Sequence, residues 1–172
     1  MTNVVTENYN KVRPDDDTHL NGTFGFCEGC PGNSNCCTGK TVELPVLTPG
    51  DVISISKEME LPASEFSTQT NGSLSEMRSR KGECFFYKND RCTIYNNRPV
   101  DCRLFPFDIL KNKENKLMLV WYSTTCPKTI DANNYTKEIK FLLSSLKPFF
   151  KEFAEHRSPL LDKHSYNVVG SI

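Results

Sequence analysis

The sequence predicts an α+β fold, on the strength of three observations. The chain has 172 residues, enough for one domain with its own hydrophobic core. Two aromatic-rich segments with central turn residues, 84–95 and 107–122, predict two β-hairpins. Apolar residues that recur at helical spacing predict a C-terminal amphipathic helix near 132–155. We expect one small antiparallel sheet made of both hairpins, with this helix packed on it.

The first third of the chain contains a polar arm and a loop. Residues 1–23 include three consecutive aspartates and predict a flexible arm. The next segment, 24–39, is rich in glycine and asparagine, which favours a loop over a helix or strand. We expect a cysteine-rich domain over 24–157, followed by a polar tail at 158–172 that frays.

Two short helices are expected over 49–69. Thr48 can cap the first of them, Pro49 suits its first position, and Asp51 adds negative charge to its first turn. Pro62 interrupts this helix and can begin the second.

Three further features lie around these elements. The alternating segment 40–47 predicts a strand, and the polar segment 68–82 predicts a connector of low order. Pro148 predicts a kink or a break in the C-terminal helix.

The amino-acid composition argues against binding to nucleic acid or to a membrane. The 21 basic and 21 acidic residues balance, so no global field attracts nucleic acid or an anionic membrane. No apolar run reaches the roughly 18 residues of a membrane-spanning helix, and the N-terminal residues lack a secretory pattern. These features predict a cytoplasmic protein. Because cytosolic thiols are kept reduced, its cysteines are expected to bind metal or act in catalysis rather than form disulfides.

All eight cysteines are predicted metal ligands. They are Cys27, Cys30, Cys36, Cys37, Cys84, Cys92, Cys102 and Cys126. The C-x2-C spacing of the first pair lets a tight turn direct both sulfurs at one ion. Redox motifs share this spacing, but here Pro31 and Gly32 continue the loop where a redox motif would begin a helix.

The other cysteines leave the grouping of ligands open. Cys36 and Cys37 are adjacent, and neighbouring side chains of an extended segment point to opposite sides. They either serve two metals, or two atoms of one cluster, or one of them is a small buried apolar residue. Cys84 and Cys92 lie at the two ends of the first predicted hairpin, which would bring their sulfurs together. The eight thiols allow two four-thiolate sites, one cluster with spare thiols, or a mixture of the two.

One string of residues is specific enough to suggest a family. From Cys84 to Phe107 the chain reads C-x7-C-x-I-Y-x2-R-P-x2-C-R-x-F-P-F, and CEGCPGNSNCC precedes it at 27–37. Over roughly residues 24–127 the sequence resembles the bacterial YkgJ-like cysteine-cluster proteins, also called the CxxCxxCC or zinc- or iron-chelating family. Five residues separate Cys30 from the Cys36–Cys37 pair, where that family usually has two.

The resemblance implies bound zinc or iron, the latter either as an ion or as an iron–sulfur cluster. It implies no particular reaction. Cysteine clusters related to those of this family also look like the ones within a flagellin lysine methylase. This suggests that some members of the family serve enzymes that modify proteins.

Arg98 and Arg103 bracket Cys102 in the family string. Guanidinium groups beside a thiolate centre would offset its negative charge and donate N–H···S bonds. Both arginines could instead pair with surface carboxylates. The resemblance favours the role beside the metal.

The sequence thus predicts a protein that binds zinc or iron through thiolates, with a structural or unassigned role and a protein as its partner. An iron or iron–sulfur enzyme or redox component acting on a protein or peptide is the alternative, and metal delivery is a third candidate. No catalytic residue is assigned, because the sequence holds no G-x-S-x-G, no H-E-x-x-H and no glycine-rich phosphate loop.

Overall fold

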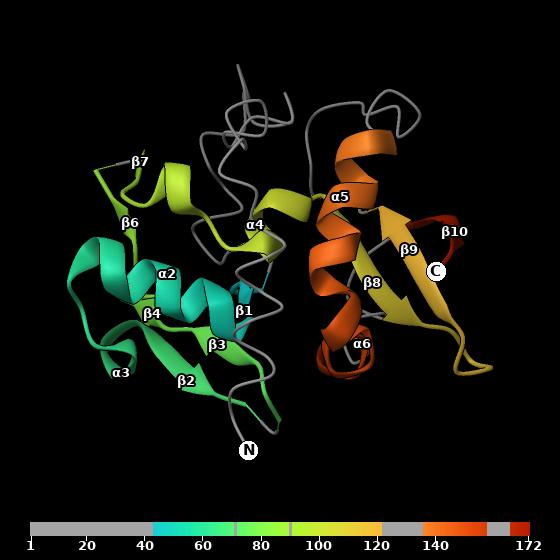
Figure 1. The fold of residues 1–172 in the computed structure, drawn as a ribbon, viewed down its shortest axis with the longest axis horizontal. Helices are drawn as coiled ribbons and strands as arrows, with labels where there is room; N and C mark the ends of the chain where they lie inside the picture. Colours follow the sequence, from blue (N-terminus) through green and yellow to red (C-terminus); the bar gives the residue numbers. More distant parts are fainter. Residues whose placement is uncertain (1–42, 71, 90, 122–135, 158–165) are drawn as a thin grey trace.

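The computed structural model describes residues 43–70, 72–89, 91–121, 136–157 and 166–172, and it confirms an α+β fold (Figure 1). Its α-helices are α2 (Pro49–Met59), α3 (Ala63–Phe66), α4 (Val100–Leu104), α5 (Thr136–Leu146) and α6 (Phe150–Arg157). The 3-10 turns are η3 (Tyr95–Asn97) and η5 (Lys147–Phe149). Within these ranges no helix combines the length and apolar character that crossing a membrane requires.

The strands are short and form several small antiparallel sheets. They are β1 (Val46–Leu47), β2 (Ser67–Gln69), β3 (Ser75–Met77), β4 (Ser79–Arg80), β5 (Glu83–Cys84), β6 (Tyr87–Lys88), β7 (Arg91–Cys92), β8 (Phe107–Lys111), β9 (Leu117–Trp121) and β10 (Asn167–Ser171). The strand orders are β1-β3-β2, β10-β9-β8, β4-β5 and β6-β7. The second predicted hairpin is present as β8–β9. The first is present only in part, as β6–β7, because Cys84 belongs to the β4–β5 hairpin, and the single shared sheet is wrong. The turn η3 and helix α4 lie between the two hairpins along the chain and separate them.

The β8–β9 hairpin closes as its sequence predicts. Its register runs from Phe107 opposite Trp121 to Lys111 opposite Leu117. In the turn, the side-chain oxygen of Asn112 accepts hydrogen bonds from the backbone N–H groups of Glu114 and Lys116, at 2.9 and 2.8 Å. An asparagine that satisfies neighbouring backbone donors in this way stabilises a turn.

The expectation that the tail frays is wrong for residues 167–171. These residues form β10, which pairs with β9 and places Val168 opposite Val120. Val168 is 58% exposed, so burial of apolar side chains contributes little here. Backbone pairing with the open edge of β9 supplies the partner that composition could not reveal.

The low-order connector expected at 68–82 is also wrong. Strand β3 lies at the centre of the first sheet, with Glu76 opposite both Val46 of β1 and Thr68 of β2. Its buried residues alternate, but one of them is Ser75 rather than an apolar residue. A serine in a buried position conceals the alternation by which strands are recognised.

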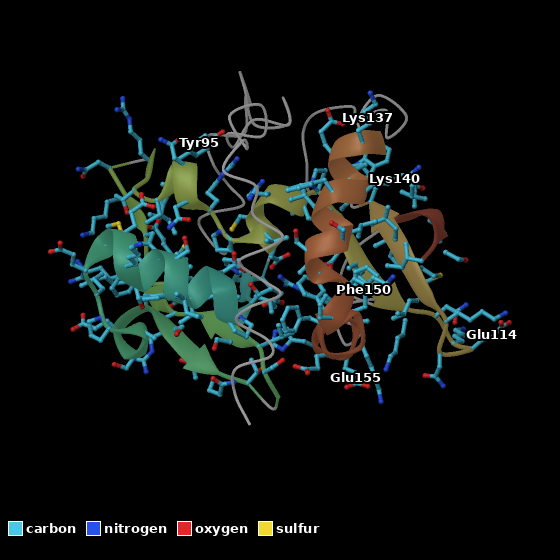
Figure 2. All side chains as sticks on the ribbon, in the orientation of Figure 1. Tyr95, Glu114, Lys137, Lys140, Phe150 and Glu155 are labelled. Carbon is cyan, nitrogen blue, oxygen red and sulfur yellow. The ribbon has the colours of Figure 1, made fainter. Side chains whose placement is uncertain are left out.

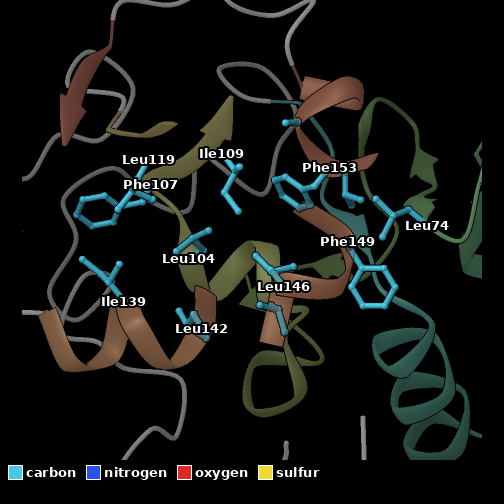
Figure 3. Packing of buried hydrophobic residues seen from close by; sticks show 13 residues of the cluster. Leu74, Leu104, Phe107, Ile109, Leu119, Ile139, Leu142, Leu146, Phe149 and Phe153 are labelled. Carbon is cyan, nitrogen blue, oxygen red and sulfur yellow. The ribbon is translucent and has the colours of Figure 1, made fainter. Parts of the chain in front are cut away.

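Two hydrophobic cores share β1, because successive side chains of a strand point to opposite faces. Val46 packs into the larger core and its neighbour Leu47 into the smaller one. The larger core lies between β8, β9 and the C-terminal helices (Figure 3). The smaller core contains Leu47, Ile55, Phe66, Met77, Phe86 and Ile94, and Cys84 and Cys92 pack against it. Figure 1 shows the corresponding groups of elements on either side of α4.

The C-terminal helical segment is divided in the way that Pro148 predicts. Helix α5 ends at Leu146, η5 contains Pro148, and α6 follows. Leu146 and Phe153 are fully buried in the larger core, and α6 packs against β8. Packing of this segment on the sheet is thereby confirmed, whereas its predicted start near residue 132 lies outside the described residues.

Helix α2 begins as its sequence predicts. The Thr48 side chain accepts a hydrogen bond from the backbone N–H of Asp51 at 3.2 Å. The Asp51 carboxylate accepts in return from the backbone N–H and the hydroxyl of Thr48, at 3.0 and 2.7 Å. This reciprocal capping box satisfies backbone donors that a helix N-terminus otherwise leaves open.

Replacing Thr48 by alanine is therefore expected to lower the free energy of unfolding by about 1 kcal/mol, the usual cost of a lost helix cap. Urea unfolding measured by circular dichroism checks this value. Lys57→Ala, an exposed change in the same helix, is the matched control and should stay near the wild-type stability. Equal stability of Thr48→Ala and the control would contradict the role of the cap.

Candidate metal centre

Three of the eight predicted ligands lie within the described residues, and each comes from a different element. Cys84 lies in β5, Cys92 in β7 and Cys102 in α4. All three side chains are partly buried. The other five, which are Cys27, Cys30, Cys36, Cys37 and Cys126, lie outside the described residues.

A tight turn places Cys84. Arg80 pairs with Glu83, and the two residues between them, Lys81 and Gly82, have φ values of 57° and 81°. Two consecutive positive φ angles are typical of the two-residue turn that matches the twist of a hairpin. Immediately after this turn, the Cys84 sulfur accepts a hydrogen bond from the backbone N–H of Phe86. Such a donor stabilises a thiolate, whether free or bound to a metal.

The expected pairing of Cys84 with Cys92 across one hairpin is not what the structure shows. Cys84 lies opposite Ser79 in the β4–β5 hairpin, and Cys92 lies opposite Tyr87 in the next hairpin, β6–β7. The chain thus makes two successive tight hairpins where the sequence suggested one longer one.

The three thiols nevertheless lie within electrostatic reach of one another. Burial is the main reason that the pKa of the Cys102 thiol rises well above its ordinary value, followed by the charges of Asp101, Cys84 and Cys92. Burial also raises the pKa of Cys84 to about 11; the Phe86 N–H opposes this rise and Cys92 adds to it. Ionising all three sulfurs together is therefore unfavourable unless a cation offsets their charge.

A cation site cannot be assembled from the described residues by themselves. Within the described part of the chain, no three His, Cys, Asp or Glu side chains form a group that could hold a metal ion. A complete centre built on these three thiols would need ligands from the cysteine-rich segment 27–37 or from Cys126.

Arg98 lies where it can act on the sulfurs. Its guanidinium stacks on the Tyr95 ring, with Cζ 3.9 Å from the ring centroid, and the residue is only 8% exposed. Its positive charge lowers the pKa of Cys102 and so favours the thiolate. A lowered pKa of Cys102 is what we expect if Arg98 offsets the negative charge of the thiolates. Arg103 follows Cys102 in α4 and has a buried Nε atom.

Helix α4, which carries Cys102, is held at its first turn by two buried aspartates. Asp51 accepts a hydrogen bond from the backbone N–H of Val100 at 3.2 Å. Asp101 accepts from the backbone N–H of Val46 in β1 at 2.7 Å. These two bonds tie α4 to the start of α2 and to the strand between the cores.

Arg157, at the end of α6, completes the support of α4. Its Nη2 atom donates to the Asp101 carboxylate, and its Nε lies 3.8 Å from the Asp108 carboxylate. Sequence reasoning missed both the ion pair and the hydrogen bonds of Asp51 and Asp101 to other elements. The only available signals were an aspartate immediately before a predicted ligand and an arginine at the end of an amphipathic helix.

The cysteine-rich part of the chain matches the model of a recognised protein family. The family model CxxCxxCC, "Putative zinc- or iron-chelating domain", matches residues 26–127, more than half of the chain. The chain belongs to the CxxCxxCC family. The matched segment contains all eight cysteines and ends before α5 and α6.

One curated relative of this CxxCxxCC protein is an uncharacterized protein from Methanocaldococcus jannaschii. It is 29% identical over 119 residues, which cover 64% of this chain and 60% of the relative. The chain therefore spans less than two thirds of the length of that relative. No solved structure gives a significant match to the chain.

The described residues fit the metals in the description of the CxxCxxCC family. Sulfur donors suit zinc and iron and are poor ligands for magnesium or calcium. The N–H donor at Cys84 and the cation near Cys102 both favour thiolates, the form in which cysteine binds a metal. Both metals accept thiolates, so the donor set does not select between them.

The raised pKa of Cys84 predicts how the metal-free protein responds to pH. The folded-state value of about 11 lies above the ordinary value of 9.0, so the folded chain holds this proton more tightly. That contribution to stability is fully present below pH 9.0 and is lost as the pH rises through about 11. Urea unfolding of reduced, metal-free protein should show the wild type losing stability over this range relative to Cys84→Ser. Parallel pH profiles of the two proteins would contradict the raised pKa.

Proposed function

We propose that this protein binds zinc or iron through cysteine thiolates, with Cys84, Cys92 and Cys102 among the ligands. The supporting observation is that these thiols, from three different elements, interact electrostatically. Cys84 and Cys92 raise the pKa of Cys102, and Cys92 raises that of Cys84, although the first and the last lie 18 positions apart in sequence. The bound ion supplies the positive charge that three neighbouring thiolates need. The remaining ligands come from the other five cysteines.

The role we propose for the metal is structural. Closed thiolate sites contribute directly to folding free energy, and they suit segments with little regular structure of their own. Here the metal would hold the glycine-rich segment 27–37 against α4 and the two short hairpins. The resulting surface would recognise a protein partner in a reducing compartment such as the cytoplasm, where the thiols stay available.

Elemental analysis and a visible spectrum of protein purified without oxygen test this proposal. Zinc without visible absorbance supports closed thiolate sites, and a chelator should then lower the thermal stability. A protein that contains no zinc or iron, binds neither when reduced, and is indifferent to chelators would sink the proposal.

A second function is favoured by one feature of the sequence, the adjacent pair Cys36 and Cys37. Adjacent thiols serve two metal atoms more easily than one, as an iron–sulfur cluster requires. In this alternative the chain is an iron-dependent enzyme or redox component that acts on a protein or peptide. Iron together with acid-labile sulfide and broad visible absorbance would move this candidate to first place.

A further inference from the structure

Arg157 lies outside the segment that matches the family, but its side chain contacts buried residues of that segment. The family match ends at residue 127, whereas Arg157 is the last residue of α6. The residue is 5% exposed, and its side chain contacts Asp101 in α4. The same Nη2 atom lies 3.4 Å from the carbonyl oxygen of Leu44, just before β1. One guanidinium therefore links the C-terminal helix to both α4 and the segment before β1.

The position of Cys102 depends on this link. Helix α4 has five residues, and a helix this short is not stable by itself. Its place is set by the bonds at its first turn, where Asp101 joins Val46 of β1 to Arg157. Asp101 is directly followed by Cys102, so a shift of the aspartate also moves the sulfur.

Arg157 also changes the charge that surrounds the thiols. Asp101 and Asp108 are buried carboxylates, and Arg157 lies between them. Without the guanidinium, Asp101 would present an uncompensated buried charge one residue from Cys102. Negative charge at that place opposes the accumulation of thiolates around a metal.

We propose that Arg157 is a positioning residue of the metal centre, which through Asp101 fixes the place of Cys102 and offsets the negative charge beside it. This inference rests on the proposed function, since it needs Cys102 to be a ligand. It makes the C-terminal helix, although outside the family segment, part of what gives the centre its affinity.

The test is a competition titration of the full, reduced chain with zinc, repeated with cobalt as a spectroscopic probe. Arg157→Met is expected to weaken zinc binding by about tenfold or more, the lower end of what loss of a supporting partner costs. The charge-transfer bands of the cobalt protein should shift, because they report the geometry of the thiolates. Arg157→Lys keeps the positive charge but not the simultaneous contact with Asp101 and the Leu44 carbonyl oxygen. This variant should therefore bind zinc more tightly than Arg157→Met and less tightly than the wild type.

Leu119→Ala is the matched control, because Leu119 is a buried residue of β9 in the larger core, where it pairs with Ile109 of β8 and Gly170 of β10. It should lower stability and leave zinc affinity and the cobalt spectrum unchanged. Wild-type affinity and spectrum in Arg157→Met, or in Arg157→Lys should the methionine variant fail to fold, would overturn the inference. So would an equal loss of affinity in Leu119→Ala. A wild type that binds neither metal would overturn the proposed function, and this inference with it.

Discussion

Replacing Asp101 by alanine is expected to lower the free energy of unfolding by about 3–5 kcal/mol, the cost of breaking a buried ion pair by removing one partner. Asp101 is 7% exposed, and its carboxylate accepts hydrogen bonds from the Val46 backbone and from Arg157. Its loss leaves the Arg157 guanidinium buried beside Asp108, whose carboxylate lies 3.8 Å from the Nε atom. It also leaves the Val46 N–H without its acceptor. Urea unfolding of metal-free protein measures the loss without a contribution from the metal.

A double variant separates the contribution of the Asp101–Arg157 ion pair from the other causes of the stability loss in Asp101→Ala. Asp101→Ala with Arg157→Met removes both charges, so the combined loss should be smaller than the sum of the two single losses. Lys111 and Glu155 provide the matched comparison, since they form an exposed pair at 2.7 Å. Glu155→Ala should change the free energy of unfolding very little, because solvent screens a surface pair. Losses of similar size for Asp101→Ala and Glu155→Ala would contradict the buried network.

The elements that the sequence predicts well are those with local signals. The Thr48 cap, the proline at the start of α2 and the break at Pro148 all depend on residues within one turn of each other. The β8–β9 hairpin combines a strand pattern with an asparagine turn, and both are adjacent in sequence. Interactions over short sequence distances can be inferred because no other part of the fold has to be known.

The missed elements depend on partners distant in sequence. Strand β10 exists because β9 offers an edge more than 45 residues earlier in the chain. Arg157 and Asp101 lie 56 positions apart in sequence, and nothing in the pattern of either segment identifies the other. Strand β3 was missed for another reason, since its buried Ser75 is not apolar.

The ligand set of the candidate site stays a prediction, whereas the backbone around three of the cysteines is described. Among the predicted residues, Cys84 and Cys92 raise the pKa of Cys102 and the charge of Arg98 lowers it. The hairpin thought to join Cys84 and Cys92 is instead two hairpins, because the Lys81–Gly82 turn begins a separate one. Residue types reveal the chemistry that a chain can perform, whereas the path of the backbone depends on turns that single residues determine.

The Cys102→Ser variant is expected to lose metal affinity by more than about a hundredfold, since losing a supporting hydrogen-bond partner alone costs roughly 10–100-fold. A serine hydroxyl has nearly the same shape as a thiol, but it does not ionise at neutral pH and is a poor ligand for zinc or iron. Cys84→Ser and Cys92→Ser should behave in the same way. Metal content after anaerobic purification and a competition titration measure the loss.

Thr93→Ser serves as the control for this series, because Thr93 follows Cys92 and its hydroxyl donates to the Phe86 carbonyl oxygen at 3.0 Å. The change keeps that hydroxyl and all eight thiols, so metal content should equal that of the wild type. Metal binding also stabilises the folded state by mass action, so a chelator should lower the melting temperature of the wild type and of Thr93→Ser. The same chelator should have little effect on Cys102→Ser. Full metal content in all three cysteine variants would remove these residues from the ligand set and leave the centre to the other five cysteines.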